Sequence, residues 1–351
     1  MTRASRFSTI LAVALLVGAA IWFFQAPPQP GAPLLPPHSY TEALRAARAG
    51  EAGAARRLYQ QLAREDLAPP ARAALYAPLP DYPSPKALVF ARQGVTDAAP
   101  AVRHAALEAL VRLLPESERA NALGPLLGDP DEGVRTAAAQ ALLELGPGNA
   151  GQYGLQLSQV LDSWSLALAA MPDDYGAQLQ LARVYLQRGA AAQAETAARR
   201  ALALRPDNLP ARVLLAQALD RLGKPDDARE TLAQPLRQHP DDAFLQHELG
   251  LWLLAHGEPT YALLALTKAV ELAPDAAEYR VDLAATLHHL DQPEAAQAQL
   301  DLLVRRQPAN RKARMLLIDY WQQAGQLQNV QILLAELEQQ NPDDPAVPQG
   351  L

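Results

Sequence analysis

The side chains of this chain that could bind a metal or move protons are few and poorly placed for either task. His288 and His289 are the only adjacent histidines, and His247 and His256 lie nine residues apart. Adjacent residues on a helix point about 100° apart, whereas residues at i and i+4 share one face. We therefore expect no metal site at these histidines.

Other chemistry-bearing motifs are missing from the sequence. The chain contains no cysteine, so it has no thiolate metal ligand, no cysteine nucleophile and no CxxCH site for heme attachment. It has no GxGxxG motif that opens a helix after a strand, no phosphate-binding loop, no HExxH and no GxSxG. No segment has the pattern of a β-strand either. Because all these motifs are missing, we predict a protein that is not an enzyme, needs no cofactor and acts by binding.

The elements that position the side chains follow a repeat of 34 residues. A period of this length without insertions is typical of stacked helix–turn–helix units, each of which buries its apolar faces against its neighbours. The sequence therefore predicts an all-α fold, a right-handed α-solenoid. The prolines that define the period are Pro172, Pro206, Pro240, Pro274, Pro308 and Pro342.

Several positions within each unit have a predictable structural role. A glycine that allows a left-handed backbone is expected to end the first helix, and Asp291 replaces it in one unit. Asn208 and Asp242, two residues after a proline, are expected to cap the following helix. A small residue is expected to let the two helices approach closely. The glycines are Gly189, Gly223, Gly257 and Gly325, and the small residues are Ala182, Ala216, Gly250 and Ala284.

This pattern is similar to that of the tetratricopeptide repeat (TPR) family, and the resemblance covers five units within residues 175–344. In that family the first helix of each unit, the A helix, lines a concave groove. The resemblance implies a protein or peptide partner and no small-molecule substrate. The family's two-carboxylate clamp needs lysine and asparagine where this chain has Leu179 and Arg183, so that kind of binding is not expected.

The groove positions of the family, carried over to this chain, predict a partner-binding surface of eleven residues. Phe244 is expected to be exposed beside His247 and Leu251 and to act as the anchor. The predicted residues are Arg183, Gln187, Gln217, Arg221, Phe244, His247, Leu251, Leu254, His288, Met315 and Asp319.

Residues 41–148 contain a second type of repeat. The pattern Asp-x4-Val-Arg-x-Ala-Ala occurs twice, 32 residues apart, with a weaker copy around Arg72. It resembles HEAT repeats, in which the aspartate and arginine positions form a ladder between successive turns. The resemblance implies that four residues hold this stack together: Asp97, Arg103, Asp129 and Arg135. We predict that residues 149–174 form a transition helix between the two repeat types.

The N-terminus resembles an export signal, because Arg3 and Arg6 precede an uncharged apolar run from Ile10 to Phe24. We expect residues 9–24 to be a retained transmembrane signal-anchor, with residues 1–8 in the cytoplasm. The alternative is a cleaved signal and a soluble periplasmic protein. The prolines within residues 25–40 predict an extended linker, and residues 345–351 a short C-terminal tail.

Charge and composition narrow the expected partners. The chain has a formal net charge of −7, and the excess of acidic residues lies within the TPR-like units, which makes nucleic acid a poor partner. Usage rich in alanine and arginine, with few lysines, suggests a bacterial protein. We therefore expect a scaffold anchored in the inner membrane, with its repeats in the periplasm, that helps to assemble a cell-envelope complex. The alternative is a chaperone-like accessory factor for secretion or cytochrome maturation.

Overall fold

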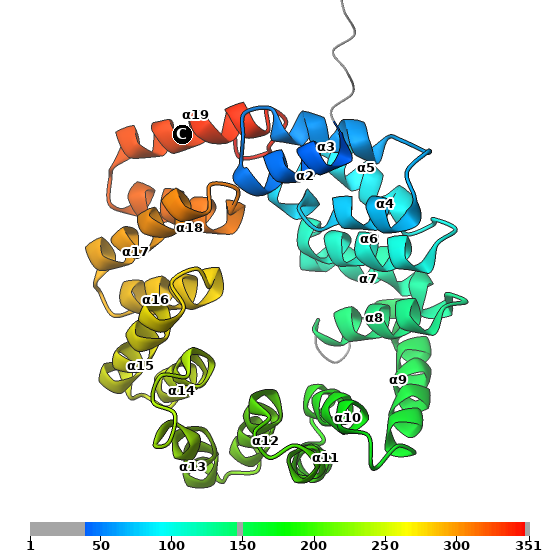
Figure 1. Cartoon of the computed structure of the whole chain (residues 1–351), viewed down its shortest axis with the longest axis vertical. Helices are drawn as coiled ribbons and strands as arrows, with labels where there is room; N and C mark the ends of the chain where they lie inside the picture. Colours follow the sequence, from blue (N-terminus) through cyan, green and yellow to red (C-terminus); the bar gives the residue numbers. More distant parts are fainter. Residues whose placement is uncertain (1–38, 146–149, 348–351) are drawn as a thin grey trace, which may run out of the picture. The chain divides into compact units, whose positions relative to one another are not determined.

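The computed structural model describes residues 39–145 and 150–347. The predicted signal-anchor, nearly all of the proline-rich linker and the last residues of the tail lie outside this part of the chain. The described residues form eighteen α-helices and three short 3-10 helices and contain no strand, which confirms the predicted all-α solenoid (Figure 1). No helix in the described ranges is long and apolar enough to cross a membrane.

The helices fall into two arrays joined by one helix. The N-terminal array comprises α2 (Tyr40–Ala49), α3 (Ala54–Leu62), α4 (Pro69–Tyr76), η1 (Leu79–Asp81), α5 (Pro85–Gly94), α6 (Pro100–Leu113), α7 (Glu116–Leu123), η2 (Gly124–Gly128) and α8 (Glu132–Leu143). The connection comprises η3 (Gly151–Tyr153) and α9 (Gly154–Ala169).

The C-terminal array consists of five helix pairs. The A helices are α10 (Tyr175–Gln187), α12 (Leu209–Arg221), α14 (Ala243–Ala255), α16 (Ala277–His289) and α18 (Arg311–Gln323). The B helices are α11 (Ala191–Leu204), α13 (Pro225–Leu236), α15 (Pro259–Leu272), α17 (Pro293–Arg306) and α19 (Leu327–Gln340).

The turns of the C-terminal array confirm the predicted roles of its small and capping residues. All four predicted glycines have φ between 71° and 76°, and Asp291 adopts the same left-handed conformation at 56°. The side chains of Asn208 and Asp242 accept hydrogen bonds from the first turns of α12 and α14. A Cβ added to Gly250 would lie 2.8 Å from the Leu266 side chain, so close packing of α14 on α15 requires the glycine.

The prolines of the 34-residue period also supply a ladder of carbonyl groups. A side chain six residues after the proline donates a hydrogen bond to its carbonyl oxygen in four successive units. The donor–acceptor pairs are Arg212 with Pro206 (3.0 Å), Gln246 with Pro240 (2.9 Å), Arg280 with Pro274 (3.4 Å) and Arg314 with Pro308 (2.8 Å). Since proline ends the preceding helix, these bonds occupy carbonyls that have no helical partner.

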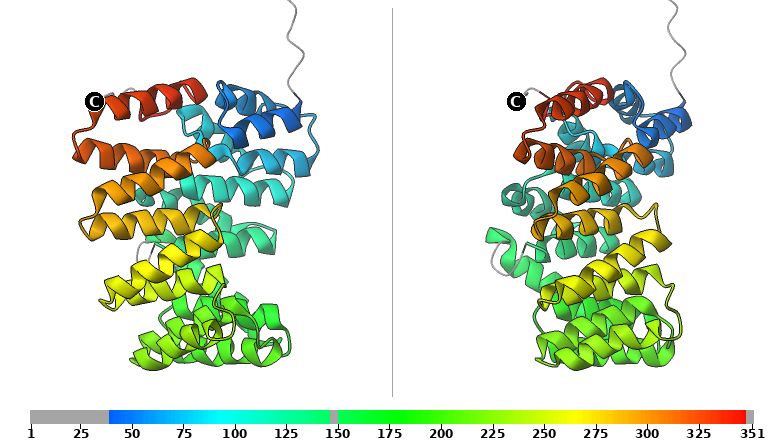
Figure 2. Two further views of the ribbon diagram at one scale, coloured as in Figure 1. Left: turned by 60° about the vertical axis from the view of Figure 1, so that its left-hand side comes forward. Right: turned by 90° about the vertical axis from the view of Figure 1, so that its left-hand side faces the viewer.

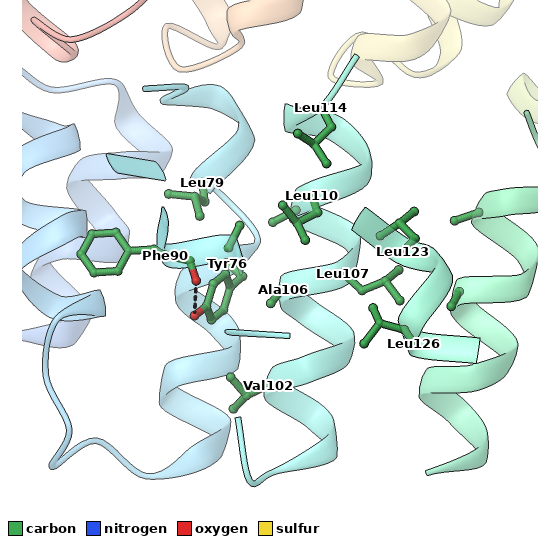
Figure 3. Packing of buried hydrophobic residues seen from close by; sticks show 14 of the residues in the cluster. Tyr76, Leu79, Phe90, Val102, Ala106, Leu107, Leu110, Leu114, Leu123 and Leu126 are labelled. Carbon is green, nitrogen blue, oxygen red and sulfur yellow. Dashed lines mark hydrogen bonds between the residues drawn. The ribbon is translucent and has the colours of Figure 1, made fainter. Parts of the chain in front are cut away.

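Aspartate–arginine pairs connect the turns of the N-terminal array, as the HEAT-like pattern predicts. Arg72 pairs with Asp97 at 2.8 Å, and Arg103 pairs with Asp129 at 2.7 Å. Arg135 donates to the carbonyl of Asp129. Leucines and alanines from α4 to α8 fill the core beside them, and the buried Tyr76 hydroxyl donates to the Phe90 carbonyl (Figure 3).

The start of α18 and the end of α19 contact the segment from α2 to α5, and we call this contact the seam. The amide of Gly53 donates to the carbonyl of Gln339 at 2.7 Å, and the Asn341 side chain donates to the carbonyl of Pro83 at 2.8 Å. A Cβ on Gly50 would lie 2.8 Å from the backbone nitrogen of Ala309. Figures 1 and 2 show α19 beside the first helices in every view. The α2–α5 helices therefore cover the open end of the C-terminal array.

Candidate peptide-binding groove

The eleven residues predicted to bind a partner all lie on the A helices of the C-terminal array, but they differ in exposure. Arg183, Gln217, Arg221 and Asp319 are exposed, whereas six others are half-buried. The half-buried residues are Gln187, Phe244, Leu251, Leu254, His288 and Met315.

Two of these predictions need correction. Phe244 is not an exposed anchor, because it is half-buried and packs against the core around α12. His247 is only 2% exposed and cannot contact a partner. Its Nε2 lies 2.8 Å from the carboxylate of Asp282, and its ring stacks on Tyr279 with centroids 4.3 Å apart.

Side chains at or beside the predicted groove connect neighbouring A helices. Arg221 of α12 donates to the carbonyl of Leu186 in α10. His256, at the end of α14, lies 2.8 Å from Asp220 of α12. His247 joins α14 to α16 as described above, and His288 of α16 stacks on Tyr320 of α18 at 3.8 Å. Each A helix is thus bound to the next by a polar or aromatic contact that supports the curvature of the array.

We expect the His247–Asp282 contact to make the stability of the array depend on pH. Burial alone would lower the pKa of His247, but the hydrogen bond with Asp282 and the nearby Glu248 carboxylate outweigh burial and raise the pKa to about 9. A raised pKa in the folded state stabilises the fold fully below the unfolded value near 6.5, and this contribution is lost as the pH rises through 9. The contribution should be on the order of 2 kcal/mol.

Urea unfolding of the wild type and of Asp282→Asn between pH 6 and pH 10 measures this effect. The variant should be less stable at pH 6 and approach the wild type at pH 10. Asp220→Asn removes the partner of the more exposed His256. This variant should lose less stability at pH 6 than Asp282→Asn does. An equal loss for Asp282→Asn at both pH values would mean that the charge of His247 is not the cause.

Two adjoining cavities lie in a different part of the molecule. The first, about 510 Å³, lies along α4, α6 and α8, and we call it the α6–α8 cavity. The second, about 570 Å³, is bounded by the end of α2, η1, α6, α16 and the start of α18, and we call it the seam cavity. Both contain Ala77 and Arg112 in their walls. The two cavities therefore adjoin at these residues, the first within the N-terminal array and the second between the two arrays, and we call the pair the groove.

Polar groups are distributed unevenly along this groove. The seam cavity contains Arg48, Arg112 and Lys312 as well as Asp81 and Glu278. The α6–α8 cavity contains Glu108, Glu144 and Gln140 above a floor of small side chains, Ala105, Ala109, Ala137 and Ala141. Burial raises the pKa of Asp81, although the positive charges of Arg112 and Arg311 oppose the shift. Among the described residues no group of three or more metal-ligating side chains occurs.

The groove was missed at the sequence level because its two walls come from different repeat types. The alanines of its floor recur at the same positions of the two HEAT-like copies. This recurrence is the one local signal from which the floor of the groove could have been predicted. Nothing in the sequence indicates that α16 and α18 approach α2 and η1.

Comparison with known proteins agrees with the two repeat types. A model of the HEAT repeats matches residues 55–146, and a model of the tetratricopeptide repeat matches residues 189–249. The resemblances are thereby confirmed for these residues. No curated protein matches the chain.

Several solved structures are similar in part. A thermophilic TPR protein of Thermus thermophilus is 25% identical, with 52% of this chain and 98% of that chain covered and a TM-score of 0.40. YrrB, a TPR protein with an unusual peptide-binding site, is 17% identical, with 54% of this chain and 97% of that chain covered and a TM-score of 0.36. Yeast Tom70 is 15% identical, with 90% of this chain and 81% of that chain covered and a TM-score of 0.44.

Proposed function

We propose that this chain, which carries HEAT repeats followed by tetratricopeptide repeats, is a scaffold that holds an extended segment of a partner protein in the groove described above. The observation that carries the proposal is that the α6–α8 and seam cavities adjoin, since Ala77 and Arg112 line both of them. A concave groove with an apolar floor and a few polar groups is the usual form of a binding site.

We further propose that the scaffold is anchored in the bacterial inner membrane by residues 9–24 and faces the periplasm, where it helps to assemble an envelope complex. Support comes from the apolar run between Ile10 and Phe24 and from the arginines before it.

Site-specific photocrosslinking in cells that express the full chain tests both proposals. A photoreactive amino acid at Gln140 or Lys312, both in the walls of the groove, should capture one or a few defined proteins. The matched control is Glu230, exposed on α13. The product should stay with the membrane fraction after alkaline extraction. Capture at Glu230 but not at Gln140 or Lys312 would refute the groove, and release by alkali would refute the anchor.

A further inference from the structure

The seam end of the groove carries positive charges that the protein itself does not neutralise. Arg48 and Lys312 are both exposed, and neither forms an ion pair with any residue in the described ranges. Arg112 pairs with Asp81 at a long distance of 3.4 Å, and 56% of its side chain is exposed. A carboxylate that enters the seam cavity would therefore find three cationic donors.

The carboxylates of the seam cavity do not cancel these charges. Asp81 is half-buried and is held by Arg112. Glu278 is exposed on α16 and has no ion-pair partner among the described residues. Because Arg112 and Asp81 engage each other, two unpaired cations, Arg48 and Lys312, remain beside one unpaired carboxylate, Glu278.

The opposite end of the groove has the opposite charge. Glu108 and Glu144 are exposed in the α6–α8 cavity, and the ion-pair contact of Glu108 with His104 is long, at 3.7 Å. The one cation of this cavity, Arg112, lies at its junction with the seam cavity. Lysine or arginine side chains are therefore the complementary groups at this end.

We propose that the groove selects an extended peptide segment with two charged ends, carboxylates in the seam cavity and lysine or arginine side chains against α6 and α8. The small alanines of the α6–α8 cavity leave room for a peptide backbone to lie close to the helices. This inference rests on the proposed function and adds the chemistry of the partner. The net charge of the chain would favour a wholly basic partner, whereas the local charges of the seam require acidic groups as well.

Fluorescence anisotropy with the full-length protein and three labelled peptides of equal length tests the inference. One peptide has an acidic half and a basic half separated by alanine and serine, the second is uniformly acidic and the third uniformly basic. The two-ended peptide should bind about tenfold more tightly than either uniform one. Equal binding of all three would overturn the inference and leave the groove itself intact, whereas binding of none would count against the proposed function.

Charge reversal supplies the matched controls. The double variants Arg48→Glu/Lys312→Glu and Glu108→Lys/Glu144→Lys should each weaken binding of the two-ended peptide about tenfold. The variant with all four substitutions should recover the affinity, because the peptide can then lie in the reverse direction. Misfolding cannot produce such a recovery. If the fourfold variant stays as weak as the double variants, the inference is wrong.

Discussion

Replacing Gly50 with valine is expected to open the seam between the two repeat arrays. Gly50 has φ of 64°, and an added Cβ would lie 2.8 Å from the backbone of both Pro308 and Ala309. Neither backbone atom can rotate away as the end of a side chain can. Because the left-handed conformation itself costs a residue with a Cβ about 1–2 kcal/mol, both the turn and the contact with the start of α18 should be lost.

The chain offers a close control for this experiment. Gly189, in the turn between α10 and α11, is also left-handed, at 74°, but a Cβ there would have no atom within 4 Å. Gly189→Val therefore carries the backbone strain without a steric conflict, and it makes none of the seam contacts. It should lower the stability of the α10–α11 turn while the two arrays stay in contact.

Distance measurements between spin labels report on the seam directly. The sequence has no cysteine, so cysteines introduced at the exposed Gln60 of α3 and Glu338 of α19 are the only labelling sites. Gly50→Val should shift the distances to longer and broader values, and Gly189→Val should not. An unchanged distribution in Gly50→Val would show that the contact tolerates the extra atoms. Loss of peptide binding together with the opened seam would connect this contact to the groove.

The parts of this fold that the sequence predicted correctly are those determined within one repeat. A glycine at the end of an A helix indicates a left-handed backbone at that residue, and a proline indicates where a helix must end. Even the exception was informative, because Asp291 keeps φ of 56° with a short polar side chain that tolerates this conformation.

Exposure on the A helices could not be predicted in the same way. His247 and Phe244 occupy positions that face the groove in an isolated unit, but residues of the neighbouring units cover them. The contact of His247 is with residues 32 and 35 positions later, Tyr279 and Asp282. The seam is more remote still, since Asn341 and Pro83 are 258 residues apart. A repeating sequence pattern describes contacts between adjacent units. It cannot predict a contact between the first and last helices of the solenoid.

The largest loss of stability is expected from Asp129→Ala in the N-terminal array. The Asp129 carboxylate accepts two hydrogen bonds from the Arg103 guanidinium, at 2.7 and 2.8 Å, and a third from the Asp131 amide. Only 10% of the arginine side chain and 5% of the aspartate side chain are exposed. Removing one member of a buried ion pair leaves an uncompensated charge, so the free energy of unfolding should fall by about 3–5 kcal/mol.

Asp97→Ala is the matched comparison, because Asp97 makes equivalent bonds to Arg72 and to the Ala99 amide. Its pair with Arg72 is more exposed, at 24% and 19%, so water can replace part of the lost interaction and the decrease should be smaller. Asp129→Asn keeps an acceptor for the Asp131 amide but loses the charge, and should lie between the wild type and Asp129→Ala.

Acid pH separates the loss of charge from a general loss of packing. Burial raises the pKa of Asp129, but the hydrogen bonds from Arg103 and the Asp131 amide outweigh burial and hold the pKa below its usual value. A lowered pKa in the folded state stabilises the fold above the unfolded pKa and ceases to do so as the pH falls through the folded one. The difference between wild type and Asp129→Ala in chemical denaturation should therefore narrow below about pH 4. A difference that stays constant with pH would show that packing, and not the ion pair, joins these two turns.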